Sequence, residues 1–217
     1  MTLQVKICGL STPETVEAAV AGGADYVGFV FFPKSPRHVT ASRAAELARL
    51  VPDKMQRCGL FVDPDDALLD SVLKAVPLEL LQLHGNESPE RCAGLRERYR
   101  RTVMKAVSIA TAEDVARAES WIGAVDLLLF DAKPPSDPAA LPGGNGLAFD
   151  WRLLAGRRWP VPWLLAGGLT AATLRDAVRM TAASAVDVSS GVESSPGIKS
   201  PALIREFLAA AKDVPTA

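Results

Sequence analysis

The sequence predicts an α/β protein built as a single (β/α)8 barrel, in which eight parallel strands form a closed ring and a helix follows each strand. Strand-like apolar segments alternate with segments of helical periodicity along the chain. Eight such pairs share 217 residues, or about 27 residues per unit, which is close to the minimum for a strand, a helix and short loops. No Gly/Ser-rich linker or change in composition divides the chain, so we expect one domain over residues 1–217.

The expected strands are short runs of β-branched, aromatic and other apolar residues. In chain order they are residues 3–8, 25–32, 56–62, 78–84, 101–107, 125–131, 161–167 and 185–189. The run LLLF at 127–130 has no polar alternation. That pattern is typical of a strand buried on both faces of a parallel sheet.

The intervening segments have the spacing of amphipathic helices. They are residues 13–21, 40–50, 64–75, 88–99, 111–121, a short segment near 150–154, 170–179 and 199–212. The segments STPE at 11–14 and SPE at 88–90 place a hydroxyl residue before a proline. This is a common helix start, because proline lacks the amide hydrogen that a first turn leaves unpaired.

A doubly wound open sheet is the alternative for a chain of alternating strands and helices. Such a sheet usually carries a GxGxxG turn after its first strand. Here the first expected strand ends in KICGL at residues 6–10, which lacks that pattern. The closed barrel is therefore the simpler interpretation.

Composition excludes several classes of function. The chain has 24 basic and 25 acidic residues, a net charge of −1, and so no electrostatic footprint for nucleic acid or an anionic membrane. No apolar run approaches the roughly 18 residues of a membrane span, and residues 1–6 do not resemble a secretory signal. Three cysteines without a CxxC pair give neither a disulfide framework nor a zinc site. We expect a cytoplasmic protein, either monomer or homodimer.

Two strand ends carry the candidate acid–base groups. Active sites of (β/α)8 barrels lie at the C-terminal ends of the strands, where Cys8 ends the first strand and Asp131 the sixth. A thiolate can remove a proton from carbon if its surroundings lower the thiol pKa. A carboxyl group after an apolar strand is costly to bury in its charged form, which suits it to donate a proton. For Cys58 and Cys92 we expect packing roles.

Three further polar residues are candidates for substrate binding. Two prolines within four residues stiffen the loop that carries Arg37, and a rigidly held guanidinium can grip a carboxylate or phosphate with two hydrogen bonds. His84 and Asp187 lie at the ends of the fourth and eighth strands. A structural hydrogen bond is the alternative for His84. Lys105 is a candidate for a salt bridge within the barrel, with no functional role.

Glycines follow the last two expected strands, at Gly167 and Gly168 and at Ser190 and Gly191. Barrels often bind a phosphate at this place, because glycine lets backbone amides approach an anion and a short helix after Gly191 would add a favourable dipole. We therefore expect a phosphorylated small-molecule substrate. The irregular segment 132–148 follows Asp131 directly, contains four prolines and GGNG at 143–146, and is expected to cover the active site.

Eight blocks together resemble the phosphoribosylanthranilate isomerases of tryptophan biosynthesis. They are VKICG at 5–9, GFVFFPKSPR at 28–37, LQLHG at 81–85, LLFD at 128–131, GGNG at 143–146, FDW at 149–151, AGGL at 166–169 and DVSSGVE at 187–193. The blocks run in order from the first expected strand to the eighth, so the resemblance covers nearly the whole chain. Asn145 departs from the pattern, because the family usually has a hydroxyl residue there.

The resemblance implies a TIM barrel that works without cofactor or metal and catalyses an Amadori rearrangement. It implies that Cys8 is the general base and Asp131 the general acid, that Arg37 binds the anthranilate end, and that the two glycine loops bind phosphate. Two alternatives stay open. One is a dual-substrate isomerase that also serves histidine synthesis, although no Gly-rich loop follows the third or fourth strand. The other is a non-catalytic barrel that senses a phosphorylated ligand.

Overall fold

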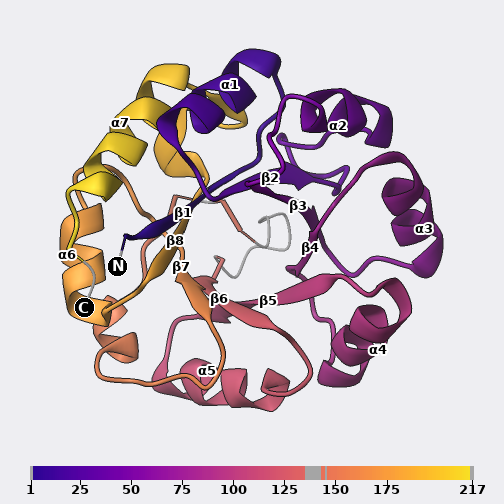
Figure 1. The fold of residues 1–217 in the computed structure, drawn as a ribbon. Coiled ribbons are helices and arrows are strands. Elements are labelled where there is room, and N and C mark those ends of the chain that lie inside the picture. Colours follow the sequence, from indigo (N-terminus) through magenta and orange to yellow (C-terminus); the bar gives the residue numbers. More distant parts are fainter. Residues whose placement is uncertain (1, 135–142, 145, 216–217) are drawn as a thin grey trace.

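The computed structural model describes residues 2–134, 143–144 and 146–215, and its eight parallel strands close into one barrel in chain order (Figure 1). The strands are β1 (Gln4–Cys8), β2 (Tyr26–Val30), β3 (Gln56–Phe61), β4 (Leu80–Leu83), β5 (Thr102–Ile109), β6 (Leu127–Ala132), β7 (Trp163–Leu165) and β8 (Ala185–Val188). β8 pairs with β1 and completes the ring. The predicted barrel is confirmed, and the open sheet is wrong because the ring leaves no edge strand at β1 or β8.

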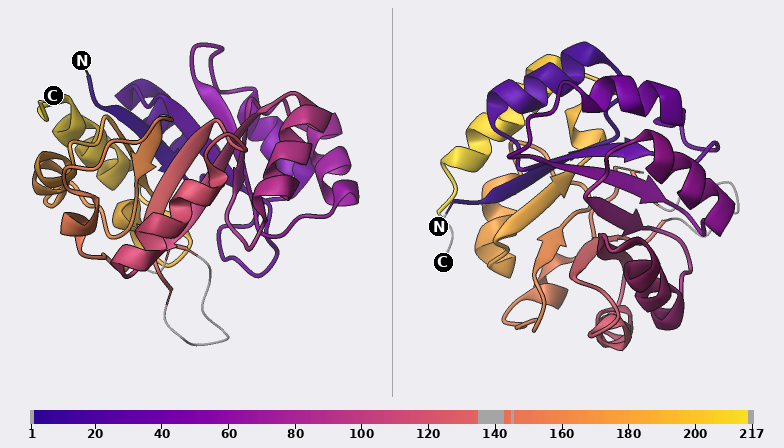
Figure 2. Two further views of the ribbon diagram at one scale, coloured as in Figure 1. Left: turned by 90° about the horizontal axis from the view of Figure 1, so that it is seen from below. Right: turned by 45° about the vertical axis from the view of Figure 1, so that its right-hand side comes forward.

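The helices surround the strands on the outside of the ring (Figure 2). They are α1 (Pro13–Gly22), α2 (Ala41–Ala48), α3 (Asp66–Ala75), α4 (Pro89–Tyr99), α5 (Ala112–Arg117), α6 (Leu174–Thr181) and α7 (Pro201–Lys212). A Ser, Thr or Asp side chain caps the first turn of six of these seven helices. Within the described residues, no helix is long and apolar enough to cross a bilayer.

Two predicted helices have a different form in the structure. The fifth ends as α5 at Arg117 and continues as a 3-10 turn, η1 (Ala118–Trp121). The segment near 150–154 is a 3-10 turn, η2 (Trp151–Leu154), capped by the Asp150 side chain. Among the described residues between β6 and β7, a short 3-10 turn therefore stands where an α-helix was expected.

The starts of the last two helices are also later than predicted. α6 begins at Leu174, because the hydroxyls of Thr170 and Thr173 bond to each other's backbone amides and form a separate turn. α7 begins at Pro201, because Lys199 belongs to a small antiparallel hairpin of β9 (Glu193–Ser195) and β10 (Ile198–Lys199). This hairpin was not predicted, although Pro-Gly at 196–197 is a turn signal in the sequence.

The core has two parts. The larger lies between the strands and the helices and includes Phe29, Phe61, Phe130 and Phe207. The smaller consists of strand residues that alternate with those of the larger part and so fill the inside of the barrel. Its buried members are Tyr26, Cys58, Leu80, Met104, Ala106, Leu129, Leu164, Ala166 and Ala185. This packed interior closes the barrel below the strand ends, as in barrels of this type.

A buried ion pair supports the loops that follow β3 and β4. Lys105 on β5 donates from Nζ to Oε2 of Glu87 at 2.8 Å and to the carbonyl of Gly85 at 2.7 Å. The Glu87 carboxylate in turn accepts from the backbone amides of Gly85 and Asp63. Both side chains are 2% exposed. The salt bridge expected for Lys105 is therefore present, and it is structural.

Removal of the Lys105 charge is expected to destabilise the barrel without affecting its chemistry. Lys105→Met leaves the Glu87 carboxylate buried without its cation, which typically costs about 3–5 kcal/mol of unfolding free energy. Urea unfolding followed by circular dichroism measures this loss. The double variant Lys105→Met/Glu87→Gln removes the uncompensated charge and should regain part of the stability. Equal stability of Lys105→Met and the unchanged protein would contradict the structural role.

Candidate active site

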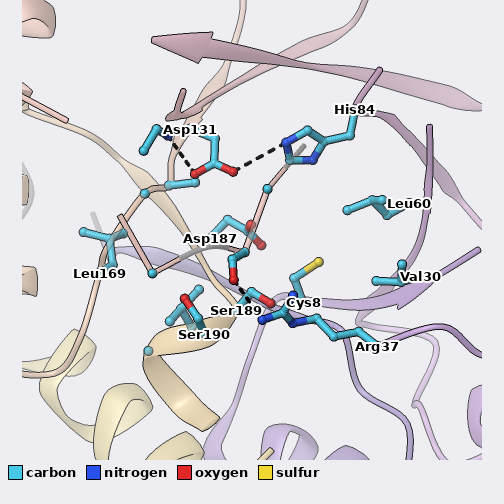
Figure 3. A pocket seen from close by; sticks show the side chains of 18 of the residues that line it. Cys8, Val30, Arg37, Leu60, His84, Asp131, Leu169, Asp187, Ser189 and Ser190 are labelled. Carbon is cyan, nitrogen blue, oxygen red and sulfur yellow. Dashed lines mark hydrogen bonds and ion pairs between the residues drawn. The ribbon is translucent and has the colours of Figure 1, made fainter. Parts of the chain in front are cut away.

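The predicted site residues meet in one pocket at the C-terminal end of the barrel. Its lining includes all nine of them, namely Cys8, Arg37, His84, Asp131, Gly167, Gly168, Asp187, Ser190 and Gly191. Figure 3 shows how the side chains of six of them lie around this pocket, namely Cys8, Arg37, His84, Asp131, Asp187 and Ser190. They come together because parallel strands end at the same face of the barrel.

Cys8 ends β1 and is 3% exposed at the wall of the pocket. Burial raises the pKa of the Cys8 thiol above its ordinary value of 9.0, and the positive charges of Lys6 and Lys199 oppose that shift without cancelling it. The role of Cys8 as a general base was expected on the condition that its surroundings lower its thiol pKa. They raise it instead. The reason is that desolvation outweighs the two cations. With its pKa raised in this way, Cys8 is mainly in its thiol form near neutral pH.

Lys6 and Asp187 form a buried ion pair next to Cys8. Nζ of Lys6 donates to Oδ1 of Asp187 at 2.8 Å, and Lys6 is fully buried. Although burial alone lowers the pKa of Lys6, the Asp187 carboxylate raises it overall, so the side chain stays charged. Gly28 makes room for the group: a Cβ at Gly28 would lie 3.2 Å from both Sγ of Cys8 and Nζ of Lys6. Sequence reasoning assigned Asp187 to the substrate and did not identify Lys6.

Asp131 lies near the end of β6 and faces the pocket. Its Oδ1 accepts a hydrogen bond from the backbone amide of Ala132 at 2.8 Å, and its Oδ2 lies 3.4 Å from Nε2 of His84. His84 is 8% exposed. It therefore contacts the candidate acid directly, in addition to lining the pocket.

Gly143 and Gly144 lie over this pair and over Arg37. A Cβ at Gly143 would lie 2.7 Å from Oδ2 of Asp131, and one at Gly144 would lie 2.5 Å from Nη1 of Arg37. Both belong to segment 132–148, which was expected to cover the active site, and they lie against the pocket residues Asp131 and Arg37. Residues 135–142 and 145 of that predicted cover fall outside the described residues.

Arg37 is held by an internal partner. Its Nε and Nη2 donate to the two carboxylate oxygens of Glu193 at 2.7 and 2.8 Å, and Nη2 also donates to the carbonyl of Gly144 at 2.9 Å. Lys199 donates to Glu193 as well, at 2.6 Å. Although burial alone raises the pKa of Glu193, the two cations lower it overall. Arg37 is buried, and Nη1 has no acceptor among the described residues, which leaves that nitrogen for a ligand.

Sequence reasoning missed Glu193 and Lys199 as supports of Arg37. Glu193 opens β9 and Lys199 ends β10, so the unpredicted hairpin brings them together. Burial lowers the pKa of Lys199, and its Glu193 partner opposes that shift. Lys199 also donates to the carbonyl and hydroxyl oxygens of Ser189. The hairpin thus ties Arg37 to the loop after β8.

The glycine loops after β7 and β8 lie against each other. Gly167 and Gly168 have φ of +84° and +68°, a region that favours glycine, and their amides donate to no acceptor in the part of the chain that the structure describes. A Cβ at Gly191 would lie 1.9 Å from the Leu169 carbonyl oxygen. The helix expected after Gly191 is wrong. A 3-10 turn, η3 (Ser190–Val192), begins before that glycine, and β9 follows it.

No group of three or more His, Cys, Asp or Glu side chains in the described ranges has the arrangement of a metal site. The pocket instead combines one thiol, two carboxyl groups, one guanidinium and two glycine loops. Asp131 has His84 beside it, and Asp187 pairs with Lys6. This set can move protons and hold an anion at each end of a ligand.

A family model described as N-(5'-phosphoribosyl)anthranilate (PRA) isomerase matches residues 5–210. The N-(5'-phosphoribosyl)anthranilate isomerase of Rhodospirillum centenum is 60% identical over 211 residues, which cover 97% of this chain and 99% of that protein. The crystal structure of phosphoribosyl anthranilate isomerase from Thermotoga maritima is 36% identical, with a TM-score of 0.87, and covers 98% of this chain and 100% of its own.

A second solved isomerase structure, in complex with reduced 1-(o-carboxyphenylamino)-1-deoxyribulose 5-phosphate, is 34% identical with a TM-score of 0.83 and covers 98% of this chain and 100% of its own. The match to the family model and the identity to the relatives both extend over almost the full length of the chain. The chain belongs to the N-(5'-phosphoribosyl)anthranilate isomerase family.

Proposed function

We propose that the chain converts N-(5'-phosphoribosyl)anthranilate into 1-(2-carboxyphenylamino)-1-deoxyribulose 5-phosphate in tryptophan biosynthesis. This reaction is an Amadori rearrangement, in which an aldose derivative becomes a ketose derivative without any change in composition. The observation that carries the proposal is the arrangement of Cys8 and Asp131. They come from β1 and β6 and line one pocket that also contains two glycine loops.

The reaction needs one acid and one base. Asp131 donates a proton to the furanose ring oxygen, the bond between that oxygen and C1 breaks, and the anthranilate nitrogen shares its lone pair to form a protonated imine. Cys8, in the small fraction of molecules in which the thiol is deprotonated at neutral pH, then removes the proton from C2, and the C–H electron pair forms a C1–C2 double bond while the nitrogen becomes neutral. The resulting enolamine moves a proton from its C2 hydroxyl to C1 and becomes the ketone.

The remaining site residues hold the two ends of the substrate. Gly167, Gly168, Ser190 and Gly191 present backbone amides to the 5-phosphate. Nη1 of Arg37 binds the anthranilate carboxylate, while Glu193 fixes the direction of the guanidinium plane. Asp187 contacts the sugar from the floor of the pocket, where Lys6 anchors it. The partner of the protein is thus a small phosphorylated molecule, bound by a single cytoplasmic domain.

A direct assay tests this function. Purified protein is mixed with N-(5'-phosphoribosyl)anthranilate, and the loss of anthranilate fluorescence is followed. Turnover of this substrate supports the proposal, and binding without turnover would instead identify a non-catalytic ligand-binding barrel. The same protein assayed on the aldose substrate of histidine synthesis, which carries two phosphates, separates a dual-substrate isomerase from a specific one.

Substitution of Arg37 is expected to weaken substrate binding more than chemistry. Arg37→Lys keeps the positive charge but loses the fork that engages Glu193 and the ligand together. KM should rise by about 10-fold or more with a smaller change in kcat, since one hydrogen-bonded charge pair is worth about 1.5–3 kcal/mol. Steady-state kinetics with Arg43→Lys, on the exposed face of α2, as a control measures this. A fall in kcat at constant KM would contradict the binding role.

A further inference from the structure

A buried amide lies behind the histidine that contacts Asp131. Gln82 is in β4, is fully buried and has no part in the mechanism above. Its side chain lies inside the barrel between Cys58 on β3 and His84, two residues further along its own strand. A buried amide is costly unless both its donor and its acceptor are paired, so the two contacts determine how the amide is oriented.

The Gln82 amide presents its NH2 group to His84 and its oxygen to Cys58. Nε2 of Gln82 lies 3.1 Å from Nδ1 of His84, and Sγ of Cys58 lies 3.8 Å from Oε1 of Gln82. Burial raises the pKa of Cys58 to about 12, so this thiol keeps its hydrogen at neutral pH and is available as a donor. A donor on the Cys58 side favours an oxygen facing it and places the NH2 group toward the histidine.

This orientation determines which histidine nitrogen carries the hydrogen. Because Nδ1 of a neutral His84 accepts from Gln82, the ring hydrogen is on Nε2. Nε2 is buried, lies 3.4 Å from Oδ2 of Asp131 (Figure 3) and has no hydrogen bond to any described residue. Oδ1 of Asp131 already accepts from the Ala132 amide. The acid proton of Asp131 therefore belongs on Oδ2, the oxygen that Nε2 faces.

We propose that Gln82 is a positioning residue for the acid step: it holds His84 in the Nε2–H tautomer, and His84 donates to Oδ2 of Asp131 as that oxygen loses its proton. A hydrogen bond to a charged acceptor is stronger and shorter than one to a neutral acceptor. The contact therefore tightens as the carboxylate forms, and it stabilises the transition state more than the ground state. This inference rests on the proposed role of Asp131.

The tautomer of His84 can be measured directly, because the chain contains only two histidines and their signals can be assigned separately. In protein labelled with 15N on histidine, the protonated and unprotonated ring nitrogens have well-separated chemical shifts. His38 is exposed and is identified by its loss in His38→Gln, which leaves the His84 signals. The spectra are recorded at neutral pH without substrate for three proteins: the unchanged protein, Gln82→Met and Gln82→Glu. Gln56→Met, at the exposed start of β3, is the matched control.

The expected result is an unprotonated Nδ1 in the unchanged protein and in Gln56→Met. Gln82→Met removes the donor and should give a mixture of tautomers, and Gln82→Glu supplies an acceptor and should place the hydrogen on Nδ1. In both Gln82 variants kcat should fall about 10-fold or more, as when an orienting partner is lost, with a smaller change in KM. Gln56→Met should keep full activity.

Three results would overturn the proposal. They are a protonated Nδ1 in the unchanged protein, an unchanged kcat in Gln82→Met, and a lower kcat in Gln82→Met with the tautomer unchanged. If Gln82→Glu does not fold, Gln82→Met and the unchanged protein still decide the matter. The tautomer is measured without substrate, so a chain without isomerase activity would still show whether Gln82 controls the tautomer of His84. A failure of the positioning role of Gln82 is therefore distinguishable from a failure of the proposed isomerase function.

Discussion

Asp131→Asn is expected to lower kcat by about 10²–10⁴-fold, the usual contribution of a general acid. Asparagine keeps the size and shape of the side chain, so the pocket and the substrate contacts of Arg37 and the glycine loops stay in place. What it loses is the ability to give a proton to the ring oxygen. The loss therefore falls on the transition state, and KM should change little. Steady-state kinetics from anthranilate fluorescence measure both constants.

Asp126→Asn is the matched control for this experiment. Asp126 precedes the same strand, β6, and lies outside the pocket lining. Its carboxylate accepts from the Val103 amide at 2.9 Å and pairs with Arg96 at the surface. The control should lose some stability but keep its kcat. If Asp131→Asn turned over substrate at a near-normal rate, Asp131 would not be the acid, and the chemistry would have to use another proton donor of the pocket.

The barrel could be predicted because its signals are local and repeated. Apolar runs such as LLLF at 127–130 identify buried strands, and cap residues such as Thr12 and Ser88 identify helix starts. Errors occur where a local pattern has two solutions. The last predicted helix begins at Lys199, yet Lys199 pairs in the hairpin with Glu193. Periodicity alone does not distinguish those outcomes.

The sequence predicts which residues form the candidate site, but it does not predict which other residues hold them in place. Strand ends converge in any such barrel, so Cys8 and Asp131 could be placed together from their positions along the chain. The contact of Arg37 with Glu193 joins residues 156 apart in sequence, and nothing local signals it. The thiol pKa could not be predicted either, because it depends on the balance between burial and the charges of Lys6 and Lys199.

Cys8→Ala and Cys8→Ser are expected to lower kcat by about 10²–10⁴-fold, since neither side chain can take the C2 proton as a thiolate does. Serine is nearly the size of cysteine, so a loss in Cys8→Ser cannot come from an empty space in the pocket wall. Cys92→Ala is the control. Cys92 is a second buried cysteine, on α4 and away from the pocket, and its removal should leave kcat unchanged.

The pH dependence separates a base from a packing residue. A base acts when it is deprotonated, and burial raises the pKa of Cys8 above 9.0. The thiolate fraction therefore increases tenfold per pH unit below that pKa. Alkylation of Cys8 by iodoacetamide, followed at that site by mass spectrometry, should rise along this curve. Over the pH range in which the acid Asp131 keeps its proton, kcat/KM should rise with the same slope, because turnover needs the protonated acid and the deprotonated base together. If alkylation and kcat/KM followed different curves over that range, or if the rise in kcat/KM persisted in Cys8→Ser, the ionisation that limits turnover would belong to another group.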